Sequence, residues 1–222
     1  MLEKLKRLIL LLLGILVPGN IYLIFVYAPE EKTMGAVQKV FYAHVASAWI
    51  GMLAFAVVFF FSIRYLITRE RASSQLALAS AEIGTVFITN VLLTGPMWAK
   101  PVWNTWWTWD PRLTTTTVMW FMYLAYLILH SGGASENRRR LAAVYGIIAF
   151  INVPIVFFSA RWWRSIHPVV ITAAETGLSD LMKITLLFTL GTFTLIYLYF
   201  LALRFRSLRL EERINNLKGG GR

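Results

Sequence analysis

The chain has 222 residues, of which 58% are hydrophobic and only 15% are charged, and it contains no cysteine. Soluble domains carry about 25% charged residues, so this composition excludes an ordinary soluble domain and also an intrinsically disordered chain. The lack of cysteine excludes a disulfide scaffold, a thiolate metal site and a catalytic cysteine. We therefore predict a polytopic, all-α membrane protein. Its net charge of +11 then becomes a question of which membrane side the cations occupy.

Six stretches are long and apolar enough to cross a bilayer, for which a helix needs about 20 residues. The first stretch contains Pro18-Gly19-Asn20, which predicts a kink. We interpret this stretch as a retained span rather than a signal peptide, because no small-residue cleavage site closes it. The predicted single membrane domain covers residues 1–222, with spans at 8–28, 40–67, 76–94, 113–129, 141–160 and 181–203.

The basic residues are divided unequally by these spans. Six spans place both termini on one side, and 15 of the 22 Lys and Arg residues fall on that side. The positive-inside rule therefore predicts that both termini are cytoplasmic. The basic charge is thus explained as an orientation signal of a protein in a lipid bilayer, and no nucleic acid is needed to account for it. Two predicted external connections, 95–112 and 161–180, are long enough to form a functional site.

All nine tryptophans fall in the predicted external half of the chain. An aromatic belt should decorate both membrane interfaces, so a one-sided cluster favours a platform for a large, flat, apolar ligand. Five of the nine lie in the connection 95–112, namely Trp98, Trp103, Trp106, Trp107 and Trp109.

Three prolines lie in the same connection. Pro96, Pro101 and Pro111 predict that no regular helix runs through it. Between the last two, tryptophans spaced i, i+3 and i+4 predict one short amphipathic turn lying on the membrane surface. Asp110 is interpreted equally well as a ligand contact or as the N-cap of the following helix.

Two of the three histidines, His44 and His167, also lie in predicted external segments. Either one alone would be typical of an interfacial polar residue. Together with the tryptophans they favour haem, because neutral imidazoles from separate elements are the axial ligands of six-coordinate haem iron. A zinc site is disfavoured by the absence of cysteine and the few external carboxylates. Small residues follow His44 on its helix face, at Ser47, Ala48 and Gly51, and predict room for a bulky group.

Polar residues also occur inside the predicted spans. Glu82 is the only acid within a span, which makes it a candidate functional group, although a bond to a neighbouring helix would also explain it. Asn90 and Asn152 are predicted to form hydrogen bonds between helices.

The segment from Trp98 to Thr114, WAKPVWNTWWTWDPRLT, resembles the tryptophan-rich WWD signature of the haem-handling proteins of cytochrome c biogenesis. With its six spans and its pair of external histidines, nearly the whole chain is similar to the CcmC branch of these proteins. The resemblance implies a bacterial inner-membrane protein that holds non-covalent, b-type haem at the periplasmic face. It implies His44 and His167 as axial ligands, and a haem platform formed by Trp98, Trp103, Trp106, Trp107, Trp109 and Asp110.

The resemblance also implies partners: an ABC-type ATPase and its membrane subunits, a small membrane subunit, and a periplasmic haem chaperone that receives the haem. The chain itself has no phosphate-binding loop and is not expected to be an enzyme. Haem propionates require cations, for which the external candidates are Lys100, Arg112, Arg161 and Arg164. The family usually has glycine at the position of Asn104, and often at that of Ala99; asparagine tolerates a left-handed backbone.

Three alternative functions remain open from the sequence. A transmembrane haem exporter or channel subunit would use Glu82. A b-type membrane cytochrome would need haems at two depths, and therefore more axial ligands than two histidines. A haem–cytochrome lyase would be longer and would carry additional histidines.

Overall fold

The computed structural model describes residues 2–32, 34–131, 135–167 and 178–219. Within these residues the secondary structure is helical, apart from turns, connecting segments and one β-bridge between Glu31 and Gly35. A π-helical turn at Leu23–Tyr27 extends the first helix, and a 3-10 turn at Ala36–Gln38 leads into the second. The α-helices are α1 (Leu2–Tyr22), α2 (Lys39–Thr68), α3 (Arg71–Trp103), α4 (Pro111–Ser131), α5 (Glu136–Phe150), α6 (Asn152–Trp162) and α7 (Asp180–Gly219).

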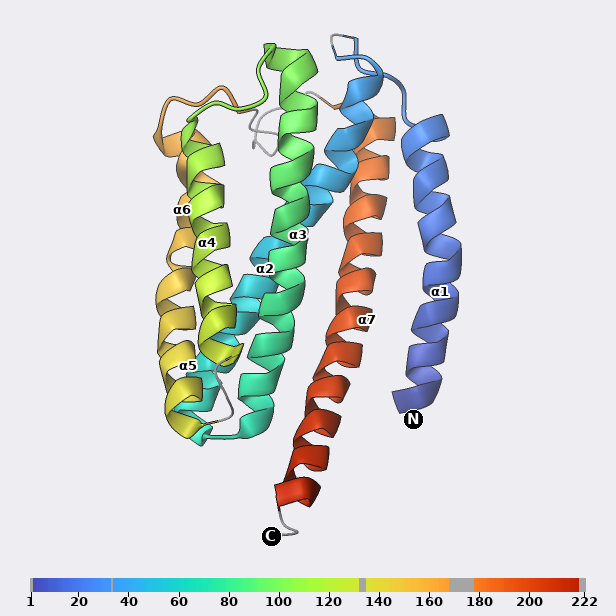
Figure 1. Cartoon of the computed structure of the whole chain (residues 1–222). Helices are drawn as coiled ribbons and strands as arrows, with labels where there is room; N and C mark the ends of the chain where they lie inside the picture. The colour runs from blue at the N-terminus through green and yellow to red at the C-terminus, as the bar shows by residue number, and fades with distance from the viewer. Residues whose placement is uncertain (1, 33, 132–134, 168–177, 220–222) are drawn as a thin grey trace.

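The helices run side by side as one bundle, and both chain termini lie at the same end of it (Figure 1). We call the opposite end, where the segments 104–110 and 163–167 lie, the distal end. The prediction of an all-α fold with six spans is confirmed. The helical stretches long and apolar enough to cross a membrane are Arg7–Tyr27, Ala36–Thr68, Arg71–Trp103, Pro111–His130, Glu136–Trp162 and Asp180–Lys218.

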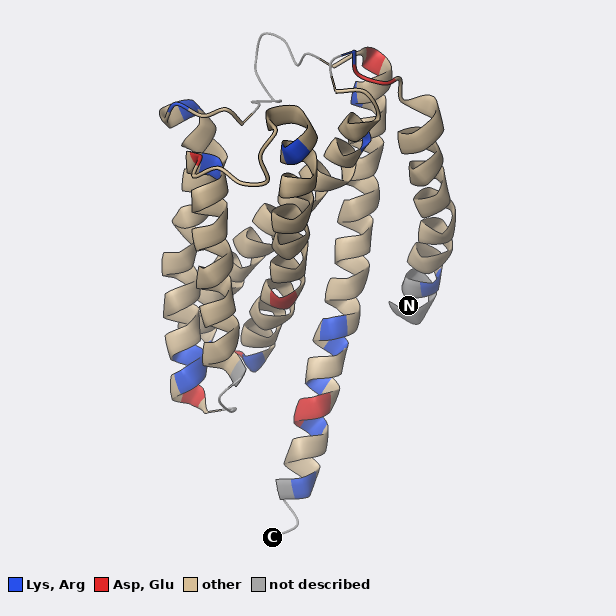
Figure 2. Ribbon diagram, turned by 45° about the horizontal axis from the view of Figure 1, so that its top comes forward, with Lys and Arg blue, Asp and Glu red and all other residues tan. Residues whose placement is uncertain are grey.

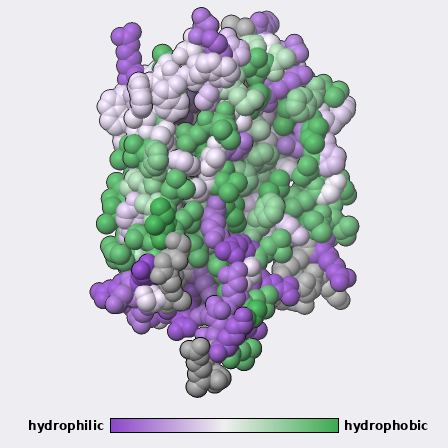
Figure 3. Space-filling model, in the orientation of Figure 1, coloured by the Kyte–Doolittle hydropathy of each residue, from purple (hydrophilic) through white to green (hydrophobic). Residues whose placement is uncertain are grey.

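The surface of the bundle has the polarity expected of a membrane protein. Figure 3 shows hydrophobic residues around its middle and hydrophilic residues gathered at its ends. Lys and Arg are concentrated at the end that carries the termini, most visibly on the last turns of α7 (Figure 2). α7 extends well beyond the other helices at this end (Figure 1).

The pair α2 and α3 forms the centre of the bundle. α5 packs on α2, α4 packs on α3, α5 and α6, and α7 packs on both central helices and carries α1 on its outer side. Two glycines allow the central pair to approach closely. A side chain at Gly51 of α2 would collide with Ile88 of α3, and one at Gly84 of α3 would collide with Phe55 of α2. The prediction that the small residues after His44 leave room for a ligand is therefore wrong at Gly51, where α3 fills the space.

The prolines of the distal end interrupt the helices less than predicted. α3 continues through Pro96 and Pro101 as far as Trp103, so only residues 104–110 remain non-helical. A proline removes one backbone hydrogen bond, which a membrane helix tolerates where neighbouring helices support it. The predicted amphipathic turn is wrong, because its second and third tryptophans, Trp106 and Trp107, lie in this non-helical segment.

The fifth span consists of two helices that meet at Ile151, just before Pro154. Pro154 has no N–H for the carbonyl four residues earlier, which explains the break between α5 and α6. In the first span, by contrast, the α-helix continues past Pro18, and a π-helical turn follows at Leu23–Tyr27. Residues 168–177 of the predicted connection 161–180, including Pro168, lie outside the described residues.

Candidate functional site

His44 lies in the second turn of α2, near the distal end, and α3 fixes its ring. Its Nδ1 is 2.9 Å from the Thr94 hydroxyl oxygen of α3. The next residue of α3 is Gly95, where an added Cβ would stand 3.5 Å from the His44 Cε1. The imidazole therefore packs against the α3 backbone, with one nitrogen hydrogen-bonded. It is half-buried, and no hydrogen bond from the described residues engages its other nitrogen, Nε2.

His167 follows the end of α6 and is held by contacts to the segment that precedes α4. The Ile166 N–H donates to Asp110 Oδ2 at 2.9 Å, and the Ser165 hydroxyl donates to Asp110 Oδ1 at 3.0 Å. The Ser165 oxygen in turn accepts the His167 backbone N–H at 3.0 Å. Both residues that precede His167 are thus bound to a single carboxylate.

Asp110 combines this tethering with the N-cap of α4, one of the two roles that the sequence left open. Its Oδ1 accepts the Arg112 backbone N–H at 2.9 Å, and its carbonyl oxygen accepts the Thr114 N–H at 2.9 Å. Only 7% of Asp110 is exposed. The Asp110 side chain therefore connects the N-terminus of α4 to the segment 165–166 and does not point into solvent.

The two histidines lie at the same end of the bundle although 122 residues separate them in the sequence. His44 lies close enough to both His167 and Arg112 to interact with them electrostatically. Arg112 is half-buried and donates from Nη2 to the Phe157 carbonyl at 2.8 Å. Helices α2, α3 and α4 and the segment after α6 therefore each supply part of one site.

The five tryptophans of the WWD segment divide into two pairs and one separate ring. Trp98 and Trp103, on the last turns of α3, meet edge to face with ring centroids 4.9 Å apart. Trp107 and Trp109 also meet edge to face, with ring centroids 5.9 Å apart. Trp109 is 81% exposed and Trp106 is 59% exposed, so these two rings lie on the outer surface.

Further large apolar side chains are exposed at the end of α6 and in the segment that follows it. Trp162 is 60% exposed and Trp163 is 51% exposed, and Ile166 is exposed next to His167. Exposed large apolar side chains are typical of a site for a ligand, a partner or the membrane interface.

The four candidate cations differ in their surroundings. The Lys100 ammonium donates to the carbonyl and side-chain oxygens of Asn104 at 3.3 and 3.2 Å, so it closes the end of α3. Arg161 is exposed, with its guanidinium 5.2 Å from the Phe157 ring centre, and Arg164 is exposed as well. Arg112, by contrast, lies close enough to His44 to interact with it electrostatically.

Asn104 has the left-handed backbone that its family position suggests, with φ of 58°. This residue ends α3 and turns the chain into the segment 104–110. Ala99 lies inside α3 and is buried, so its helical backbone places no demand for glycine there.

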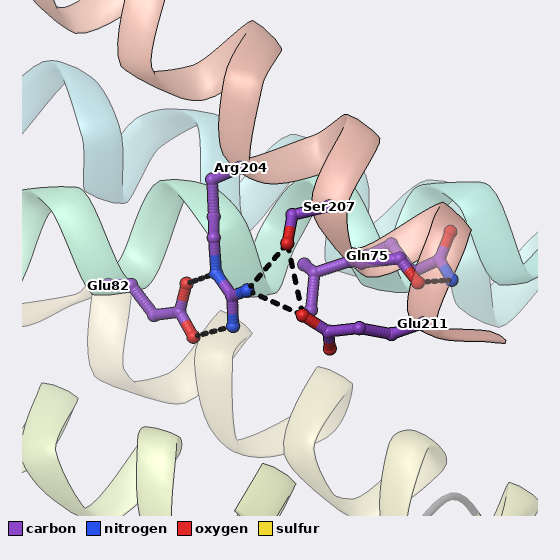
Figure 4. A network of polar contacts seen from close by, with 6 residues as sticks. Gln75, Glu82, Arg204, Ser207 and Glu211 are labelled. Carbon is purple, nitrogen blue, oxygen red and sulfur yellow. Dashed lines mark hydrogen bonds and ion pairs between the residues drawn. The ribbon is translucent and has the colours of Figure 1, made fainter. Parts of the chain in front are cut away.

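Glu82 lies on α3 toward the other end of the bundle and has a partner on α7 (Figure 4). Arg204 donates to both of its carboxylate oxygens, at 2.5 and 2.9 Å, and also to Glu211 at 3.1 Å. A bidentate pair between two helices is a sufficient structural role for this acid. Asn90 and Asn152 likewise form the predicted bonds between helices, to Ser47 and to the Thr115 carbonyl.

The distal site offers groups suited to an anionic, iron-containing macrocycle. Within the described residues, Trp98 Nε1 and Arg112 Nε are buried donors without a hydrogen-bond partner. The described residues contain no cluster of three or more His, Cys, Asp or Glu that could hold a metal ion. Two imidazoles without further protein ligands form the donor set of haem iron.

Sequence reasoning missed Thr94 and Ser165. Thr94 stands at the end of the predicted third span, but its partner His44 is 50 residues earlier, and no local pattern links them. Ser165 had a detectable signal, because a serine two residues before a histidine can form a local side-chain to backbone turn.

Comparison with known proteins identifies relatives over most of the chain. The model of the CcmC family, described as heme exporter protein C, matches residues 1–219. A heme exporter protein C of Bradyrhizobium diazoefficiens is 33% identical over 194 residues, covering 86% of this chain and 74% of the relative. That of Escherichia coli K12 is 31% identical, covering 84% and 76%. A ccmC-like mitochondrial protein of Marchantia polymorpha, named for cytochrome c biosynthesis, is 31% identical, covering 86% and 82%.

Proposed function

Because this chain belongs to the heme exporter protein C family, we propose that it binds haem between His44 and His167 and presents it to a periplasmic haem chaperone. Proteins of this family handle haem for cytochrome c biogenesis as membrane components and are not enzymes. The observation that carries the proposal is that both histidines are tied to the WWD segment or to the helix that leads into it: His44 is bonded to Thr94 of α3, and the two residues before His167 are bonded to Asp110.

Each group of the site has a role in this proposal. His44 and His167 provide two imidazoles to the iron of a non-covalently held, b-type haem. The exposed rings of Trp106 and Trp109 provide apolar area for the macrocycle. The unpartnered donors of Trp98 and Arg112 suit the propionates, which need charge-assisted hydrogen bonds in a half-buried site.

Exposure of the platform suits delivery better than storage. Trp109 and Trp106 are largely exposed on a non-helical segment, whereas a permanent haem site is normally enclosed. Haem held at such a surface is accessible to a second protein, which can take it without any covalent chemistry on this chain.

The arrangement of charge supports the orientation in which the distal end faces the periplasm. Basic residues concentrate at the end that carries the termini (Figure 2), and such ends face the cytoplasm. The proposed location is the bacterial inner membrane. The proposed partners are the other subunits of a heme exporter complex: an ABC-type ATPase, its membrane subunits and a small membrane subunit.

Two alternative functions gain no support from the structure. In the exporter alternative Glu82 would line a path for haem through the helices. This carboxylate is instead bound by Arg204 of α7, and it lies in the half of α3 away from the distal end. A transmembrane cytochrome needs four axial ligands. The one remaining histidine, His130, lies near the other end of α4, with its Nε2 3.1 Å from the Tyr126 hydroxyl.

Absorption spectroscopy of the purified protein in lipid nanodiscs tests the proposal. We expect a six-coordinate, low-spin haem spectrum from the unaltered chain. His44→Ala and His167→Ala should each abolish that spectrum, whereas His130→Ala should retain it. If both ligand variants keep a bis-histidine spectrum, the proposed function is wrong.

A further inference from the structure

We propose that Thr94 is a positioning residue that fixes the tautomer of His44, with the proton on Nδ1 and the lone pair on Nε2. The inference rests on the proposed function for the ligand role of His44. It adds that Nε2 is the ligand atom of His44 and that Thr94 determines this choice between the two ring nitrogens. The basis is the hydrogen bond of 2.9 Å between His44 Nδ1 and the Thr94 hydroxyl.

The hydroxyl of Thr94 has only one proton, and the helix already uses it. Its oxygen is 2.7 Å from the Asn90 carbonyl one turn earlier, the usual bond of a threonine within a helix. A hydroxyl that donates to this carbonyl can offer His44 only its lone pairs. The hydrogen bond between the two side chains therefore requires the proton on Nδ1, which leaves Nε2 free to bind a metal.

The same turn of α3 is anchored to α2 a second time. The Asn90 amide donates to the Ser47 hydroxyl at 2.7 Å, and Ser47 donates to the Ala43 carbonyl at 2.7 Å. Asn90 thus contributes its carbonyl to Thr94 and its side chain to α2. Because these bonds fix the register of the two helices, Thr94 faces His44 without depending on any loop.

A donor bond from Nδ1 changes the imidazole as a ligand. When the ring N–H donates to an oxygen, Nε2 becomes more basic and a better ligand, and metal affinity typically falls roughly 10- to 100-fold when such a partner is removed. The stronger ligand also stabilises ferric over ferrous iron. We expect loss of the Thr94 hydroxyl to weaken haem binding and to shift the haem reduction potential to more positive values.

The haem-free protein allows the tautomer to be tested directly, because the chain has only three histidines. Nitrogen NMR of protein with ¹⁵N-labelled histidine distinguishes protonated from unprotonated ring nitrogens, and the His44→Ala spectrum assigns the His44 signals. In the unaltered chain we expect His44 as the Nδ1–H tautomer. Thr94→Val removes the hydroxyl at constant shape and should give a mixture of tautomers, and Thr94→Ser should restore the single form.

Thr192→Val is the matched control. Thr192 makes the same bond to a carbonyl one turn earlier, to Phe188 at 2.9 Å on α7, and this substitution should leave the His44 signals unchanged. An Nε2–H tautomer in the unaltered chain, or an unchanged spectrum in Thr94→Val, would overturn the inference.

Haem titration and redox potentiometry separate this inference from the proposed function. Thr94→Val should lower haem affinity at least several-fold and raise the reduction potential, and Thr94→Ser should restore both. If Nδ1–H is found but His44→Ala still binds haem with both axial ligands, the proposed function fails while the tautomer assignment stands. If both histidines bind haem but the tautomer is Nε2–H, the inference fails while the function stands.

Discussion

The two histidines of the distal site are held by different kinds of structure. His44 is part of a long helix and is hydrogen-bonded to Thr94 of the adjacent central helix. His167 follows the last turn of α6, and its position depends on the bonds of Ser165 and Ile166 to Asp110. His44 is therefore held by two packed helices of the core, whereas the two residues before His167 are tethered to the Asp110 carboxylate.

Removing the Asp110 carboxylate should give the largest effect. Asp110→Ala leaves the Ile166 N–H and the Ser165 hydroxyl without their acceptor and removes the N-cap of α4. We expect a loss of about 2–4 kcal/mol of stability. Haem should become five-coordinate, bound by His44 alone, while circular dichroism retains the helical content.

Asp180→Ala is the control for Asp110→Ala. Asp180 is an acid near the distal end whose side chain is 91% exposed and pairs with Lys183. Its removal should leave haem coordination unchanged. Six-coordinate haem with unaltered affinity in Asp110→Ala would contradict the tether.

A change far from both histidines should affect stability alone. Glu82→Gln removes the charge that Arg204 pairs with, toward the other end of α3. We expect a loss of roughly 1–2 kcal/mol, because both side chains are about one-third exposed and the pair is partly screened. Haem affinity should remain unchanged in a titration. A selective loss of haem binding would instead favour the exporter alternative.

Ser165→Ala tests one link of the tether without removing the carboxylate. Asp110 keeps the Ile166 N–H, and the His167 N–H loses its acceptor. We expect a cost of about 1 kcal/mol, which corresponds to a fall in haem affinity of roughly 5-fold. Titration should show a smaller effect than Asp110→Ala; an effect as large would mean that Ser165, and not Asp110, determines the position of His167.

The smallest effect is expected from glycine at Asn104, where the backbone is left-handed. Asn104→Gly should leave stability and haem affinity nearly unchanged, because glycine adopts positive φ without cost. Asn104→Val should cost about 1–2 kcal/mol, because a β-branched residue is strained there. Thermal unfolding of the two variants measures the difference, and equal stabilities would show that the backbone at this turn relaxes freely.

The sequence was sufficient to predict an all-helical fold with six spans. Hydropathy located the six spans, and the resemblance implied the axial roles of His44 and His167. It could not predict the partners of Asp110, because Ser165 and Ile166 lie more than 50 residues away. Glu82 shows the same limit, since its partner Arg204 is 122 residues distant.

Local rules were also overridden by the membrane fold. Pro96 and Pro101 predicted an irregular segment, yet α3 runs through both, because packing against neighbouring helices outweighs the loss of single backbone bonds. The small face after His44 was interpreted as ligand space, although α3 occupies it at Gly51. Patterns within one helix do not reveal which neighbour covers a given face.

Rescue by imidazole tests the central claim, ligation by both histidines, most directly. His44→Gly and His167→Gly each remove an imidazole that added imidazole can replace, and electron paramagnetic resonance of the ferric protein detects six-coordinate, low-spin haem. We predict that each variant loses this signal and regains it on addition of imidazole. A low-spin signal that persists in either variant without imidazole would contradict the account.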